Sequence, residues 1–177
     1  PAVGAMIGLL IGLFWIGLNE LVAPLMSSAI TVMLGVVITG AFHEDGFADT
    51  ADSLGGFSPE RRLEIMKDSR VGTFGSLALI FSVLVRIIAL AELEPIHGLV
   101  ALVLAHSVGR SLATLVMATT PPAAKKGLGQ SYTAHLPRPK VFAMGVFIAA
   151  CSVACGPAGL AGYMIALAGA GFIVLFA

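Results

Sequence analysis

The chain has 177 residues, of which 58% are hydrophobic and 11% charged, and its mean hydropathy is +0.98. This composition excludes an ordinary soluble domain and indicates a protein of the lipid bilayer. Ten Lys and Arg residues balance ten Asp and Glu residues, so the net charge of zero gives no reason to expect a nucleic-acid partner.

Six apolar stretches follow one another along the chain, and most approach the ~20 residues that a membrane-spanning helix needs. They cover residues 2–18, 21–42, 71–90, 96–118, 141–155 and 158–177, of which the fifth is short. Backbone amides inside hydrocarbon must be satisfied within their own segment, and no stretch alternates with the period of a membrane barrel. The sequence therefore predicts an all-α, polytopic membrane bundle of about six transmembrane helices, which forms a single domain over 1–177.

Lys and Arg residues fall into alternate connections between these stretches. Residues 43–70 carry four of them and residues 119–140 carry another four, whereas the other three connections carry none. The positive-inside rule then predicts that both long loops lie in the cytoplasm. Within the second loop, Lys125 and Lys126 are expected to contact anionic lipid.

Residues 43–56, HEDGFADTADSLGG, place four carboxylates directly after the second apolar stretch. Asp45, Asp49 and Asp52 stand at i, i+4 and i+7, so a helix here projects them from one stripe. Hard oxygen ligands without thiolates suit Mg²⁺, Mn²⁺ or Ca²⁺, and Mg²⁺ commonly shares its shell with the phosphates of a substrate. A solvated acidic helix cap is the alternative, but a cap needs one acid rather than four. The predicted metal ligands are Glu44, Asp45, Asp49 and Asp52, with His43 as a candidate for the outer shell.

The next segment, FSPERRLEIMKDSR at 57–70, predicts a short interfacial helix with Ser58 as its N-cap. Glu60, Glu64 and Asp68 recur at four-residue intervals among Arg and Lys residues. Ordinary ion pairing between neighbours explains part of this pattern. Interleaved charges of both signs also suit a metal-bound pyrophosphate, because acids hold the cation while Arg and Lys hold phosphate oxygens. Glu64 is a further candidate for the outer shell.

Two sequence blocks, HEDGFADTADSLGG and RRLEIMKDSRVGTFG at 61–75, closely resemble the signature of the adenosylcobinamide-GDP ribazoletransferase family, the cobalamin synthases. The likeness continues more weakly through RIIALAE, AHSVGRS, KGLG and the opening PAVGAMIGLLIGL. Members of that family are longer at both ends, so we expect this chain to lack N- and C-terminal parts of the full length.

The resemblance implies a Mg²⁺-dependent, multi-pass enzyme of the cell inner (cytoplasmic) membrane. It would join adenosylcobinamide-GDP to α-ribazole, or to α-ribazole 5′-phosphate, and release GMP, in contact with membrane lipid. The sequence leaves open whether it forms an oligomer. On the same resemblance, Glu44, Asp45, Asp49 and Asp52 fall on the family's acidic motif, and Asp68 and Arg70 fall on its Lys-Asp-Ser-Arg element.

Displacement of GMP from a pyrophosphate by a ribose hydroxyl is phosphoryl transfer, in which charge on the phosphate oxygens must be matched while the reacting groups are held in line. Lys67 and Arg70 are the cations expected to neutralise the departing GMP. Asp49 and Asp68 are both candidates to accept the hydroxyl proton, and the sequence does not choose between them. The predicted catalytic residues are Asp49, Asp68 and Arg70.

Two arginines lie inside apolar stretches, where an unpaired charge costs about 3 kcal/mol. Arg110 follows His106 by one helical turn and is expected to bind substrate phosphate, together with Lys67 and Arg70. Arg86 is expected to extend towards Glu92 or the lipid headgroups.

Two other classes of membrane protein share some of these features. A phosphotransferase of the CDP-alcohol type also uses spaced aspartates and Mg²⁺, but its Asp-x-x-Asp-Gly pattern matches this chain only in style. An ion or metal transporter also carries intramembrane charges, but it would place acids within the spans rather than at one edge.

Overall fold

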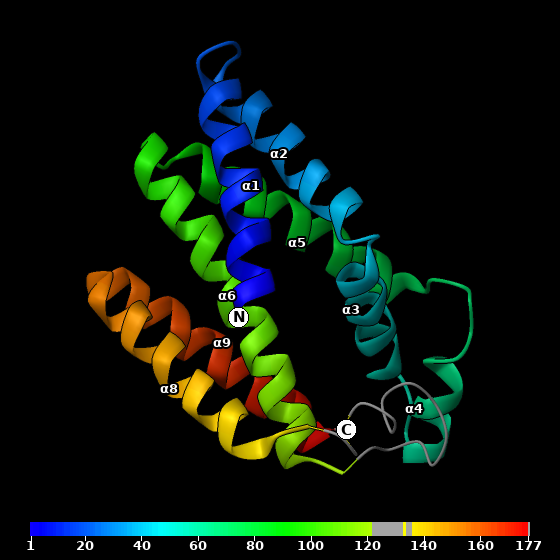
Figure 1. The fold of residues 1–177 in the computed structure, drawn as a ribbon. Helices are drawn as coiled ribbons and strands as arrows, with labels where there is room; N and C mark the ends of the chain where they lie inside the picture. Colours follow the sequence, from blue (N-terminus) through cyan, green and yellow to red (C-terminus); the bar gives the residue numbers. More distant parts are fainter. Residues whose placement is uncertain (122–132, 134–135, 177) are drawn as a thin grey trace. The chain divides into compact units, whose positions relative to one another are not determined.

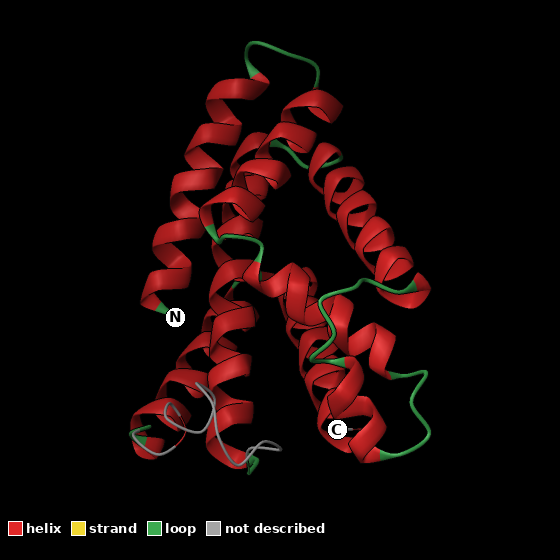
Figure 2. Ribbon diagram, turned by 90° about the vertical axis from the view of Figure 1, so that its right-hand side faces the viewer, coloured by secondary structure: helices red, strands yellow, loops and turns green. Residues whose placement is uncertain are grey.

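The computed structural model describes residues 1–121, 133 and 136–176. Within these residues every regular element is a helix, as Figure 2 shows. The helices, labelled in Figure 1, are α1 (Ala2–Asn19), α2 (Pro24–Ile38), α3 (Phe42–Ser53), α4 (Pro59–Ile65), α5 (Thr73–Ala91), α6 (Pro95–Thr119), α8 (Arg138–Ala154) and α9 (Gly156–Phe176). The all-α fold class is thus confirmed.

Four of the described helices, α1, α5, α6 and α9, are long and apolar enough to cross a membrane. The bent pair of α2 and α3 makes a fifth span if the pair is counted as one. The sequence predicted about six, and the shortfall lies in α8, because its 17 residues do not reach the same length. The protein is a multi-pass membrane protein with four or five such spans among the described residues.

The stretch 21–42, predicted as one span, is not one helix, and its chain turns by 90° between α2 and α3. α2 ends in a Schellman motif, in which Gly40 N–H donates to the Val37 carbonyl and Ala41 N–H donates to the Val36 carbonyl. Gly40, at φ 65°, takes the left-handed conformation that this motif requires. Ala41 follows at φ 57°, and two successive left-handed residues turn the chain sharply.

Residues Ile11–Gly98 form one of two compact units, and the division between the units falls within α1 and α6. Inside this unit, α5 packs against both α2 and α3, and α3 also contacts α4. Trp15 is fully buried and its indole N–H donates to Ser28 Oγ across 3.3 Å. The hydroxyl of Ser27 donates to Asn19 Oδ1 at 2.7 Å, so polar contacts connect α1 and α2 in a mostly apolar setting.

The second unit consists of residues Pro1–Leu10 and Leu99–Ala177. Its buried centre is formed by Val108, Leu112 and Ile148, and α8 packs against α9. Gly4 and Gly8 face the α6 backbone so closely that a Cβ at either position would meet it. Such a Gly-x-x-x-Gly spacing lets membrane helices approach at backbone distance.

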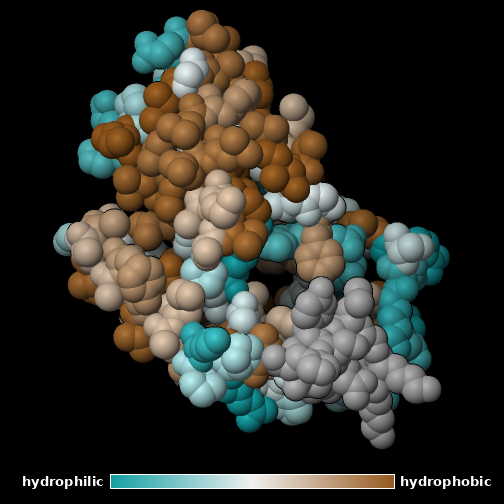
Figure 3. All heavy atoms as spheres, viewed as in Figure 1, coloured by the Kyte–Doolittle hydropathy of each residue, from teal (hydrophilic) through white to brown (hydrophobic). Residues whose placement is uncertain are grey.

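The outer surface of the Ile11–Gly98 unit is strongly apolar. Phe81 and Val85 of α5 are 63% and 62% exposed, which suits contact with lipid tails. Figure 3 shows hydrophobic surface over α2, whereas hydrophilic surface gathers where α4 and the segment after it lie. The charged residues of the candidate site lie on α3, on α4 and on the connection from α4 to α5.

Candidate active site

The acidic segment forms the helix that its spacing predicts. α3 begins after Ala41, and its first turn contains Glu44 and Asp45, where negative charge is favoured by the helix dipole. Ala48, 2% exposed, marks the face of α3 that packs against α5. Asp45 and Asp49 project from a neighbouring stripe, one helical turn apart. Among the described residues, neither of them has a hydrogen-bond partner or an ion pair.

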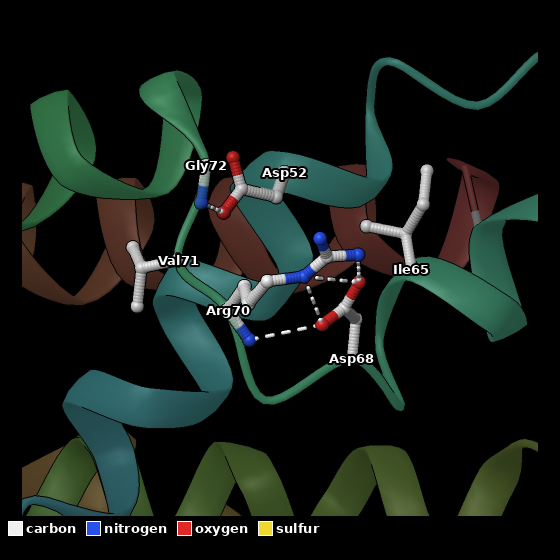
Figure 4. Close-up of a pocket in the computed structure, with 6 residues that line it drawn as sticks. All are labelled: Asp52, Ile65, Asp68, Arg70, Val71 and Gly72. Carbon is white, nitrogen blue, oxygen red and sulfur yellow. Dashed lines mark hydrogen bonds and ion pairs between the residues drawn. The ribbon is translucent and has the colours of Figure 1, made fainter.

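Asp52 has a different environment, because both of its carboxylate oxygens bind the first turn of α5. Oδ2 accepts from the Gly72 N–H at 2.7 Å and Oδ1 accepts from the Gly75 N–H at 2.8 Å (the Gly72 bond is drawn in Figure 4). Gly72 is the N-cap residue of α5 and has no side chain with which to cap it. Asp52 therefore supplies, from another helix, the acceptor that an N-cap Ser or Asp normally provides.

The two glycines are required by this contact. A Cβ on Gly72 or Gly75 would collide with the Asp52 carboxylate, and one on Gly75 would also meet the Ala48 carbonyl. The segment Gly72-x-x-Gly75 thus allows α3 to lie directly against the beginning of α5. Gly is a common N-cap residue, so nothing in the sequence pointed to Asp52 as a cap from another helix.

Arg86 of α5 pairs with Glu44, and the expectation that it extends towards Glu92 or the headgroups was wrong. Its Nη1 donates to Glu44 Oε1 at 2.9 Å, and its Nε donates to the Ser82 carbonyl at 3.2 Å. α3 lies along α5, so the acid of α3 is the nearer partner. The side chain of Glu44 is only 16% exposed, and its Oε2 is buried without a described hydrogen-bond partner. An arginine inside an apolar stretch signalled that some counter-charge was needed.

α4 begins as predicted, with Ser58 Oγ accepting from the Arg61 N–H at 3.2 Å. Glu64, a candidate for the outer shell, pairs with Arg61 across 2.8 Å. Both side chains are about two-thirds exposed, at 64% for Arg61 and 66% for Glu64, so this pair contributes little to stability. Lys67 follows α4 and is exposed.

Asp68 and Arg70 form a two-pronged pair on the connection between α4 and α5. Arg70 donates through Nε to Asp68 Oδ1 at 3.0 Å and through Nη2 to Asp68 Oδ2 at 2.7 Å, as Figure 4 shows. The hydrogen bonds from the Arg70 side chain and backbone lower the pKa of Asp68 to about 2, and the same contact raises the pKa of Arg70. Both groups of the pair are therefore ionised near pH 7.

A depression of about 360 Å³ lies beside this pair. Its lining, drawn in Figure 4, consists of Asp52, Ile65, Asp68, Arg70, Val71 and Gly72. The end of α3 and the connection from α4 to α5, which are separated in the sequence, thus meet at one surface. Charged groups of both signs border this hollow.

The remaining predicted residues lie in other surroundings. The His43 ring contacts the Phe42 ring edge to face, with centroids 6.0 Å apart. Arg110 belongs to the other compact unit, where its Nη1 lies 3.0 Å from His106 Nδ1. Nowhere in residues 1–121, 133 and 136–176 do three His, Cys, Asp or Glu side chains converge closely enough to hold a metal ion. Lys125 and Lys126 lie outside the described residues.

Comparison with known proteins identifies the family to which the chain belongs. The sequence profile described as cobalamin-5-phosphate synthase matches residues 1–177, the whole chain. The chain belongs to the cobalamin-5-phosphate synthase family. This membership confirms the resemblance carried by the acidic block and the Lys-Asp-Ser-Arg element.

Curated members of the family are named adenosylcobinamide-GDP ribazoletransferase. The protein of Azorhizobium caulinodans is 44% identical over 136 residues, which cover 72% of this chain and 50% of that protein. The protein of Allorhizobium ampelinum is 45% identical over 139 residues, 74% of this chain and 52% of its own length. The protein of Stutzerimonas stutzeri is 38% identical over 178 residues, 98% of this chain and 71% of its own length. The chain thus spans about half the length of the first two relatives. No solved structure matches it.

Proposed function

We propose that the protein to which this chain belongs joins adenosylcobinamide-GDP to α-ribazole, or to α-ribazole 5′-phosphate, and releases GMP. Support comes from the family match over the whole chain and from relatives that are named for this transfer. The family match favours this function over a CDP-alcohol phosphotransferase and over an ion or metal transporter.

The observation that carries the proposal is that Asp45 and Asp49 have no partner of opposite charge among the described residues. They lie one turn apart on α3, and no described residue neutralises either of them, although Asp49 is half-buried. Two adjacent carboxylates without partners repel each other, and a bound cation relieves that repulsion. Asp52, which follows Asp49 by three residues, lines the depression beside Arg70, so the end of α3 borders the surface that we propose for the pyrophosphate.

The donor set fits Mg²⁺ or Mn²⁺. Mg²⁺ is usually bound by one or two carboxylates and completes its shell with water and substrate phosphates, so Asp45 and Asp49 are sufficient protein ligands. A bound Mg²⁺ would neutralise charge on the pyrophosphate oxygens and help to orient them.

Cations of this chain would hold the phosphate groups. Arg70 uses Nε and Nη2 for Asp68, while its Nη1 has no partner among the described residues and faces solvent with the rest of an 85% exposed side chain. Asp68 therefore fixes the plane of the guanidinium, and the unused edge can donate to a phosphate oxygen. Lys67 is the other proposed phosphate contact in this unit, and the phosphate role of Arg110, which belongs to the other unit, stays a prediction.

Asp49 is the better candidate to accept the proton of the attacking hydroxyl. A general base works best when its pKa lies near the working pH, and the pKa of Asp68 is lowered to about 2 by Arg70. Asp68 then serves to orient Arg70. His43 and Glu64 are proposed not to contact the metal or the phosphates directly, and to influence the site only through the residues next to them.

The protein is proposed to reside in the cell inner membrane, with residues 43–70 and 119–140 on the cytoplasmic side. The support is the alternation of Lys and Arg between connections, which follows the positive-inside rule. On that side, both substrates would reach the acidic helix from the cytoplasm.

The deciding experiment measures GMP released from adenosylcobinamide-GDP by the full-length protein in detergent with Mg²⁺. We expect release that depends on α-ribazole or its 5′-phosphate, and that stops when the metal is chelated. A reaction without the ribazole acceptor is the control for plain hydrolysis. Absence of acceptor-dependent GMP release would overturn the proposed function.

A further inference from the structure

Two polar contacts tie α3 to α5, and both leave from the same face of α3. Glu44, Ala48 and Asp52 stand at i, i+4 and i+8, so they share one side of the helix. Ala48 is buried against α5, and the carboxylates on either side of it each bind α5. Asp45 and Asp49 lie on the adjoining stripe.

The two contacts attach α3 at both of its ends. Asp52, in the last turn of α3, binds the N–H groups of Gly72 and Gly75 at the beginning of α5. Glu44, in the first turn of α3, binds Arg86, which follows Thr73 by 13 residues, about 20 Å along the helix axis. α3 therefore runs antiparallel to α5, and the pair of ties fixes both its position along α5 and its rotation about its own axis.

The attachment of α3 to α2 does not by itself fix that rotation. The intrahelical hydrogen-bond ladder of α2 ends in the Schellman motif at Gly40, and α3 starts a new ladder with Asp45 N–H donating to the Ala41 carbonyl. Helical continuity from α2 is therefore interrupted, and the direction in which Asp45 and Asp49 point depends on the contacts with α5.

We infer that Arg86, Glu44 and Asp52 are positioning residues, which lock the rotation of α3 so that Asp45 and Asp49 together present their carboxylates to the metal-bound substrate. This assigns Glu44 and Asp52 to α5 rather than to the predicted metal shell. The inference rests on the proposed function for what Asp45 and Asp49 bind, and on the structure for how they are held.

The chemistry of each tie suits this role. Arg86 donates through Nη1 to a carboxylate of low exposure while its Nε donates to the Ser82 carbonyl, so the orientation of the guanidinium is set, and neither charge is stable alone beside an apolar span. A carboxylate that accepts two N–H groups at a helix start is similarly directional and is favoured by the dipole of α5. Each tie also occupies the carboxylate, so Glu44 Oε1 and both oxygens of Asp52 already have protein partners.

The test is a double-mutant comparison on the full-length protein in detergent, with two readouts that do not depend on turnover. The variants are Arg86→Gln, Glu44→Gln, the two combined, and Arg86→Lys, with Arg61→Gln as the matched control from an exposed ion pair. For each one, the thermal midpoint is measured without metal, and Mn²⁺ affinity is measured by electron paramagnetic resonance.

Arg86→Gln leaves the Glu44 carboxylate without its partner, so we expect the midpoint to fall by about 4 °C or more. We expect Mn²⁺ affinity to fall about tenfold or more as α3 rotates. The combined variant removes both charges and leaves two amides that can hydrogen-bond to each other in place of the ion pair. It should therefore recover most of the midpoint, with Mn²⁺ affinity returning to within about threefold of wild type. Arg86→Lys, which keeps the charge, should fall between wild type and Arg86→Gln, and Arg61→Gln should match wild type.

Three results would overturn the inference. If Glu44 is a metal ligand, the combined variant will bind Mn²⁺ as poorly as Glu44→Gln. If the ion pair only stabilises the fold, Arg86→Gln will lower the midpoint without changing Mn²⁺ affinity. If wild type does not bind Mn²⁺, Asp45 and Asp49 are not metal ligands to be positioned. Failure of wild type to release GMP, by contrast, would contradict the proposed reaction. The thermal midpoint and the Mn²⁺ affinity would still test the inference, because neither depends on turnover.

Discussion

Asp45 and Asp49 differ from the other acids of α3 in having no described protein partner, so their loss should affect chemistry rather than folding. We expect Asp45→Asn and Asp49→Asn each to abolish GMP release, because a proposed metal ligand loses its charge while the apolar spans are untouched. The measurement is GMP release by purified variants, together with their yield in the membrane fraction.

Glu60→Gln is the matched control for these two variants, because Glu60 is an exposed acid in the first turn of α4. It should retain wild-type turnover. Wild-type turnover by either aspartate variant would contradict the metal assignment.

Arg70 holds Asp68 through two nitrogens of one planar group, a geometry that a lysine ammonium cannot reproduce. We expect Arg70→Lys to lower turnover by about 10- to 1,000-fold, as removal of one preorganised donor does, with expression unchanged. Arg61→Lys is the control, since Arg61 makes only an exposed pair with Glu64. Near-normal turnover by Arg70→Lys would refute the phosphate role, because a residue that merely anchors the helix to headgroups tolerates Lys.

The pH dependence distinguishes Asp68 from Asp49 as the base. The pKa of Asp68 is lowered to about 2 by the hydrogen bonds of Arg70. Because the folded pKa lies below the unfolded value, this contact stabilises the protein above about pH 4 and is lost only as the pH falls through about 2. Between about pH 5 and 9, Asp68 therefore does not titrate, and Asp68→Asn should reduce kcat/KM by a constant factor. A pH–rate profile whose acid limb moves in Asp68→Asn would show that Asp68 is the titrating base.

At the scale of elements, the break between α2 and α3 sets where the acidic helix goes. Ala41 sits there in the left-handed region, which costs an L-residue with a Cβ roughly 1 kcal/mol. Ala41→Gly should therefore raise the free energy of unfolding by about 0.5 to 1 kcal/mol, or the thermal midpoint by about 1 to 4 °C.

The matched control for the break is Ala51→Gly, the same substitution in the interior of α3. There the backbone is right-handed, so glycine should lower the thermal midpoint. Equal effects of the two substitutions would contradict the left-handed conformation of Ala41.

Local signals in the sequence were enough for most helices. Ser58 next to Pro59 marks the beginning of α4, and long apolar runs mark α1, α5, α6 and α9 to within a few residues. The break between α2 and α3 was missed because Thr39, Gly40 and Ala41 lie inside an apolar run, where a glycine is as common as in any membrane helix. Its effect depends on the Schellman hydrogen bonds, which residue type alone does not reveal.

The acids of α3 were found from their spacing, but their partners were not. Asp52 and Gly72 are 20 residues apart, and Glu44 and Arg86 are 42 apart. Neither contact produces a periodic pattern in the sequence, because each one forms only when α3 packs antiparallel along α5. The predicted metal and phosphate roles remain predictions.

For the whole molecule, the membrane orientation can be tested in the second long loop. Tags inserted within 121–137 should report a cytoplasmic location, because four Lys and Arg residues lie in 119–140. Accessibility of the tag to a membrane-impermeant reagent, in intact cells and after permeabilisation, checks this. A tag between α5 and α6 is the control and should label from the opposite side. Labelling of 121–137 from outside would reverse the whole topology.

The position of Asp52 before α5 in the chain also determines the order in which the cap and the capped helix are synthesised. Residue 52 is synthesised before residue 72, so the carboxylate is already present when the first turn of α5 leaves the ribosome. If the cap came from a later helix instead, the N–H groups of Gly72 and Gly75 would have no protein acceptor until that helix had been synthesised. In this protein the helix that carries the acids is made first, and the span that it caps can complete its first turn as soon as it emerges.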